Sequence, residues 1–117
     1  MSDKSHESKV LDALVGQQLS AVTFVQDYLQ LDFEGKRLTI NIWPTVSLSR
    51  NEFHIGDVGY RDALCAAIGA DVAGTSETDS EILIRFDIGH IVISLAEDNG
   101  IERVIFEDVV TRTWAYW

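Results

Sequence analysis

Two stretches of the chain alternate apolar and polar residues in the same order, and this pattern restricts the possible folds more than any other feature. They are "LQLDFEGKRLTINI" at 29–42 and "ILIRFDIGHIVISL" at 82–95, separated by a constant offset of 53 residues. Because a period of two places alternate side chains on one face, each stretch is expected to form a β-hairpin with one buried face. Gly35 in the first turn can adopt a positive φ, as tight hairpin turns often require. The second turn is expected at 87–89.

The same offset relates the segments before the hairpins. In "ALVGQQL" and "AAIGADV", Gly16 corresponds to Gly69. Each glycine follows apolar residues at helical spacing, which predicts a short helix ending there. Each half is therefore expected to contain a short helix, a glycine, a strand and a hairpin, with the repeat covering about 9–43 and 60–96. The apolar helix positions are Val10, Leu11, Leu14 and Val15 in the first half, and Tyr60, Leu64, Ala67 and Ile68 in the second.

Further strands are expected outside the repeat. An Asn99-Gly100 turn favours another hairpin, followed by a strand over 101–106. A short strand at 46–48 would be kept at a sheet edge by Pro44. We predict a β-rich α+β domain of six to eight antiparallel strands with two short helices. The two halves, related by a pseudo-twofold axis, would form a sandwich or a partly open barrel. Residues 9–117 form this single domain, and 1–8 are expected to be a flexible polar tail.

The charge of the chain is strongly negative. The net charge is -10, and residues 62–108 contain eleven acids and two bases. Such a surface repels phosphate backbones, so no nucleic-acid partner is expected. The N-terminal segment has no apolar core of the kind that a signal peptide needs, and no apolar run approaches the roughly 20 residues of a membrane span. We therefore expect a cytoplasmic protein without membrane contact. The acids either maintain solubility or attract a basic partner.

Few residues indicate catalysis or metal binding. "HIGD" contains His54 and Asp57, and "DIGH" contains Asp87 and His90, which together could form a metal site if they converged. Turn chemistry explains their spacing equally well, so we expect no metal and no cofactor. Cys65 lies beside two alanines, and a buried thiol acting as a small apolar side chain is the preferred interpretation.

The C-terminal segment "RTWAYW" leaves two interpretations open. In an extended conformation, Trp114 and Tyr116 would share one face, with Ala115 and Trp117 on the other. The segment either closes the core of the domain or contacts a second subunit or partner, where Trp and Tyr are favoured anchors. A homodimer through these aromatics is one form of the second interpretation.

"LVGQQLSAV" followed by "YLQLDFEGKRLTI" resembles the opening of several small uncharacterised bacterial families with β-rich domains, some of them associated with toxin-immunity loci. The resemblance covers about residues 14–42. It implies a non-enzymatic protein that binds and neutralises a partner. It supplies no active-site motif.

The sequence favours a protein-interaction module, immunity-like, that binds a basic partner through acidic and aromatic residues. One alternative is a small-ligand binder with a cavity between the hairpins, lined by Phe33 and Phe86. Another is an enzyme of unrecognised type, with His54 or His90 beside an acid. The predicted partner-binding residues are Asp79, Glu81, Glu97, Asp98, Glu102, Glu107, Asp108, Trp114, Tyr116 and Trp117.

Overall fold

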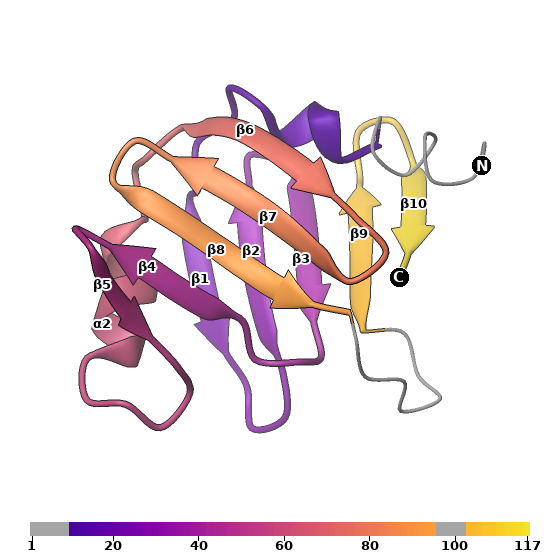
Figure 1. Ribbon diagram of the computed structural model, residues 1–117. Coiled ribbons are helices and arrows are strands. Elements are labelled where there is room, and N and C mark those ends of the chain that lie inside the picture. The colour runs from indigo at the N-terminus through magenta and orange to yellow at the C-terminus, as the bar shows by residue number, and fades with distance from the viewer. Residues whose placement is uncertain (1–9, 96–102) are drawn as a thin grey trace.

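The computed structural model describes residues 10–95 and 103–117, which form two antiparallel five-stranded sheets packed face to face (Figure 1). The first sheet has the order β1 (Ala21–Phe24), β2 (Leu29–Phe33), β3 (Lys36–Ile40), β9 (Val104–Asp108) and β10 (Thr113–Tyr116). The second has the order β5 (Asn51–Phe53), β4 (Thr45–Leu48), β8 (Gly89–Ser94), β7 (Glu81–Phe86) and β6 (Val72–Glu77). The prediction of a β-rich sandwich is confirmed.

Both predicted hairpins are present, one in each sheet. β2 pairs with β3 across a turn in which Glu34 and Gly35 have φ values of 50° and 94°. Two successive positive φ values give the chain the twist that a two-residue hairpin needs. β7 pairs with β8 across Asp87 and Ile88.

The apolar positions of the two hairpins form the centre of the core. Leu29, Leu31 and Phe33 are fully buried, as are Ile82 and Ile84 on the facing sheet. Burying each such side chain contributes roughly 1.5–3 kcal/mol relative to leaving it in water. The alternation seen in the sequence is therefore the packing pattern of a sandwich core.

The numbers and positions of several elements differ from the prediction. The described residues contain ten strands rather than six to eight, together with the α-helix α2 (Tyr60–Ala66). Where the first short helix was expected, Val10 and Leu11 are α-helical and the 3-10 turn η1 (Asp12–Leu14) follows them. β4 is not an edge strand, since it pairs with both β5 and β8. Pro44 immediately precedes β4, so its missing N–H costs the ladder nothing. The predicted tail at 1–8 and the Asn99-Gly100 turn lie outside the described residues.

Cys65 was predicted to be buried, and this prediction is wrong. Gly59, with φ 92°, leads into α2, and the helix then buries Tyr60, Ala63 and Leu64 against the sheets. This spacing defines one helical face. Cys65 lies on the opposite face and is exposed.

A short antiparallel ladder joins the segments that precede β1 and β6. Its centre is the bridge between Gln18 and Asp71. Its four hydrogen bonds form two pairs, and within a pair each residue of one bond lies 53 positions from the corresponding residue of the other. In the first pair, Gly16 N donates to Val72 O at 2.8 Å and Gly69 N donates to Leu19 O at 2.8 Å. In the second, Leu19 N donates to Ala70 O at 3.0 Å and Val72 N donates to Gln17 O at 2.9 Å. The internal repeat stays a prediction. If it holds, these contacts lie on the pseudo-twofold axis that relates the two halves.

Candidate protein-interaction surface

The C-terminal strand β10 divides its side chains between the core and the solvent. Ala115 is buried, and Trp117 packs against the core while its indole Nε1 donates to Glu77 Oε2 at 2.7 Å. Trp114 and Tyr116 are 55% and 52% exposed on the other face. The segment therefore closes the core with two residues and leaves two large aromatics open. The role of Glu77 was not predicted, because no sequence pattern relates residues 40 positions apart.

The exposed aromatics extend two rows of side chains across the outer face of the first sheet. In one row, Trp114 lies beside Glu107, which lies beside Arg37. Arg37 donates from Nε to Asp32 Oδ1 at 2.7 Å, and this hydrogen bond, with the charge of Asp32, raises the pKa of Arg37. In the other row Tyr116 lies beside Ile105. Arg37 thus lies between the two acids of this row, Glu107 and Asp32, and neutralises part of their charge.

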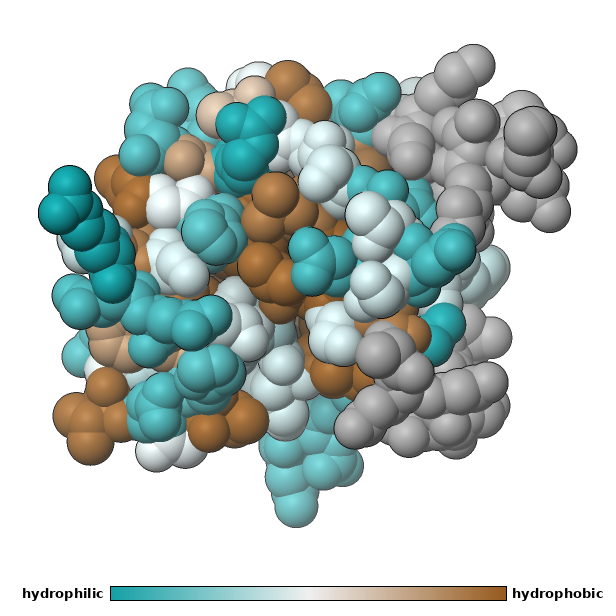
Figure 2. Space-filling model, viewed as in Figure 1, coloured by the Kyte–Doolittle hydropathy of each residue, from teal (hydrophilic) through white to brown (hydrophobic). Residues whose placement is uncertain are grey.

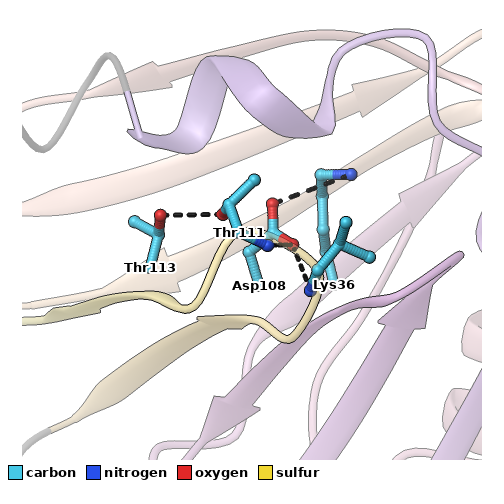
Figure 3. A network of polar contacts seen from close by, with 5 residues as sticks. Lys36, Asp108, Thr111 and Thr113 are labelled. Atoms are coloured by element: carbon cyan, nitrogen blue, oxygen red, sulfur yellow. Dashed lines mark hydrogen bonds and ion pairs between the residues drawn. The ribbon is translucent and has the colours of Figure 1, made fainter.

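Asp108 is buried and its carboxylate is used inside the β9–β10 turn (Figure 3). Its Oδ1 accepts from the amides of Val110 at 3.0 Å and Thr111 at 3.2 Å, and its Oδ2 lies 3.9 Å from Lys36 Nζ. Loss of hydration opposes the charged form, but the hydrogen bonds from Thr111 and Val110 and the charge of Lys36 outweigh it and lower the pKa of Asp108. This geometry gives Asp108 a structural role and leaves it little surface for a partner.

The other predicted acids lie in different environments. Asp79 and Glu81 are exposed at the β6–β7 turn, where the Thr78 hydroxyl accepts from the Glu81 amide at 3.2 Å. Because Glu77 at the end of β6 contacts Trp117, this turn lies at the β10 end of the sandwich (Figure 1). Glu107 is half-buried. The remaining predicted acids, Glu97, Asp98 and Glu102, lie outside the described residues.

The two His-Asp segments do not converge into a metal site. Asp57 Oδ2 accepts from the His54 amide at 2.7 Å and lies 3.5 Å from its Nδ1, a contact within one turn. His90 belongs to a different hairpin, where it lies beside Arg85 in the sheet register. Among residues 10–95 and 103–117, no group of three or more His, Cys, Asp or Glu side chains could hold a metal ion.

The second sheet carries an open groove of about 600 Å³ at the end where the β4–β5 and β7–β8 turns meet. Charges of both signs line it, including Arg50 and Asp87, together with the imidazole of His90. The guanidinium of Arg85 extends over Gly74 in the neighbouring strand, because glycine leaves that space open. Figure 2, which views this sheet from outside, shows apolar side chains near the middle of the face with polar ones around them. The groove is a surface feature with no concentrated charge.

The space between the two hairpins is filled rather than hollow. Phe33 is fully buried and Phe86 is 6% exposed, and both belong to the packed core. A second surface hollow, of about 460 Å³, lies at the start of α2 beside Asp57 and Tyr60. Arg61 there stacks 5.0 Å above the centre of the Phe24 ring.

No family model, curated protein or solved structure matches the chain. The resemblance to families associated with toxin-immunity loci therefore stays a prediction. Within the described residues, no helix is long and apolar enough to cross a membrane.

Proposed function

We propose that the chain is a non-enzymatic protein-interaction module that binds a basic protein partner. The observation that carries the proposal is the exposure of Trp114 and Tyr116, at 55% and 52%, on a strand whose other side chains close the core. Each such ring can bury roughly 150–250 Å², so leaving about half of each in water forgoes a substantial apolar stabilisation. Protein contacts are where exposed Trp and Tyr most often recover it.

The expected sign of the partner follows from charge. The chain carries -10, and Asp79 and Glu81 project from the β6–β7 turn near the end of β10. An acidic surface of this kind accelerates association with a basic protein and disfavours acidic ones. The resemblance seen in the sequence suggests an immunity-like role, in which the partner is a toxin domain that the chain neutralises.

A homodimer through the C-terminal aromatics belongs to the same proposal. Trp114 and Tyr116 would contact the second copy, and exposed acids of the second sheet such as Glu81 would stay open to the basic partner. A small-ligand function has less support, because the groove beside His90 is open and is lined by charges of both signs, with no concentrated charge to select a ligand.

The proposal is tested with matched charge variants. The chain and its Asp79→Asn/Glu81→Gln double variant are immobilised, and proteins retained from a lysate of the source cells are compared. A protein retained by the wild type is then purified for binding kinetics. Glu52→Gln serves as the control, since Glu52 is exposed on β5, in the edge strand farthest from β6 within its sheet.

The expected partner is basic, and its association rate with the wild type falls roughly ten-fold or more between about 50 and 300 mM salt. The double variant should associate several-fold more slowly, and Glu52→Gln should behave like the wild type. Equal retention of every protein by the wild type and the double variant, without salt dependence, would refute the proposal.

A further inference from the structure

β10 has one edge that no described strand covers. It ends the first sheet, and β9 is its single neighbour among the described residues. The amide of Trp117 donates to the carbonyl of Val104 at 2.9 Å, so the backbone groups of Trp117 face β9. Alternate residues of an antiparallel strand point these groups to opposite sides. Those of Ala115 therefore face β9, and those of Trp114 and Tyr116 face the open edge.

The residues with open backbone groups are also the ones with open side chains. Trp114 and Tyr116 each present an N–H, a C=O and a ring that is more than half exposed. An uncovered edge with apolar side chains is a template for pairing with another strand. Natural proteins usually protect such edges with charge or proline, and β10 (Thr113–Tyr116) contains neither.

We infer that β10 pairs with β10 of a second copy, antiparallel, about a twofold axis through Ala115. This inference rests on the proposed self-association and specifies its register. Trp114 then lies opposite Tyr116 of the second copy, and each of the two symmetric pairs exchanges two N–H···O bonds. An axis through Trp114 would instead pair Tyr116 with Arg112, whose φ of 59° takes it out of the strand. Only the axis at Ala115 keeps both bonded pairs within β10.

The charges at the ends of this pairing are complementary, although the chain as a whole is acidic. In the same register Thr113 lies opposite Trp117 of the second copy, and Arg112 follows directly. Since Trp117 contacts Glu77, Arg112 of each copy approaches the β6–β7 hairpin of the other, where Asp79 is exposed. Each contact brings a cation to an acidic turn, and the symmetry produces it twice.

The size of the contact sets its strength. Each half-exposed ring contributes roughly 100 Å², so the four rings and the edge backbone stay below the roughly 1,200 Å² of a standard interface. We expect a Kd on the order of 100 µM. The first sheet of one copy would join the first sheet of the other, and the two would form one continuous sheet.

The register is tested by disulfide trapping. In a Cys65→Ser background, which removes the exposed thiol, the Trp114→Cys and Tyr116→Cys variants are oxidised separately and as an equimolar mixture. A hydrogen-bonded antiparallel pair has a Cα separation of about 5.5 Å, within the range of a disulfide. The mixture should give several-fold more covalent dimer than either variant alone. Equal yields in all three samples would overturn the register.

Association is tested by sedimentation equilibrium between about 10 µM and 1 mM, which brackets the expected Kd. The wild type should shift from monomer to dimer over this range. Tyr116→Pro removes an N–H from the open edge alone, which an edge strand tolerates, and it should remain monomeric with an unchanged circular-dichroism spectrum. Val58→Ser changes a loop residue that is 97% exposed and should dimerise like the wild type.

A wild type that stays monomeric at every concentration would overturn the inference, as would a folded Tyr116→Pro variant that dimerises normally. If Tyr116→Pro fails to fold, the disulfide mixture still decides. Neither result depends on the basic partner, since that proposal fails only if the Asp79→Asn/Glu81→Gln double variant retains the same proteins as the wild type. The two failures are therefore distinguishable.

Discussion

Replacing Gly89 with alanine should cause one of the largest losses of stability available from a single methyl group in this chain. Gly89 lies in β8 directly against β4, opposite Leu48. A Cβ at this position would lie 1.9 Å from the carbonyl oxygen of Ser47 and 2.9 Å from Leu48 Cδ2. Carbon and oxygen ordinarily approach no closer than about 3.3 Å, so β4 and β8 would have to separate by more than about 1 Å at this point.

The size of the loss follows from that separation. About two ladder hydrogen bonds would be broken or stretched, at about 1 kcal/mol each. Strain from overpacking adds about 1–3 kcal/mol. We expect Gly89→Ala to reduce the free energy of unfolding by about 3–5 kcal/mol, out of roughly 6–18 kcal/mol for a chain of this length.

Gly74→Ala provides a matched control in the same sheet. A Cβ there would also overlap a neighbour, but the atoms that it meets are those of the Arg85 guanidinium, at the far end of an exposed side chain. Because that side chain can rotate away, Gly74→Ala should cost less than about 1 kcal/mol. Urea denaturation, with the slope checked for two-state behaviour, gives both values. A loss for Gly89→Ala of under about 1 kcal/mol, or no larger than that of Gly74→Ala, would refute the steric argument.

Three further substitutions test other contacts. Tyr60→Phe removes a buried hydroxyl that donates to the carbonyl of Pro44 at 2.6 Å, and should cost about 1–2 kcal/mol in urea denaturation; burial raises the pKa of Tyr60 to about 12, so the hydroxyl stays protonated in the native state. Asp108→Asn should destabilise the protein at pH 7, because the pKa of Asp108 is lower in the folded state than in the unfolded one. The difference in unfolding free energy between variant and wild type should therefore shrink as the pH falls below about 4. A difference that is independent of pH would contradict this. Trp117→Phe keeps an aromatic ring but loses the bond to Glu77, and should cost about 1 kcal/mol by the same assay, whereas no loss would show that the two sheets do not depend on this contact.

The hairpins could be predicted from the sequence because their information is local. In β2–β3 and β7–β8, neighbouring residues alternate and a turn joins the strands, so the buried face can be assigned from spacing alone. The same spacing argument correctly separates Trp114 and Tyr116 from Ala115 and Trp117. Which of these faces is buried depends on β9 and on the opposite sheet, and spacing does not contain that information.

The errors concern contacts between distant parts of the chain. β4 was expected at an edge because Pro44 precedes it, yet the first ladder position comes after the proline and β5 covers the other side. Cys65 was assigned to the core from its alanine neighbours, although its helical phase relative to Tyr60 and Leu64 points outward. Asp108 was grouped with surface acids because its two amide donors belong to a turn that only the folded β9–β10 pair creates.

The pairing of β3 with β9 has a kinetic consequence. Ile40 pairs with Val104, 64 positions later in the chain, so the first sheet cannot be completed from local contacts. Sheets that depend on such distant pairings fold in milliseconds to seconds rather than microseconds. Until β9 pairs with β3, β3 is an edge strand of the early meander β1–β2–β3, although it becomes the central strand of the finished sheet. During that time Leu38 and Ile40 lie on an unpaired edge. Refolding yield should therefore fall as protein concentration rises, because during that interval another chain competes for the place of β9.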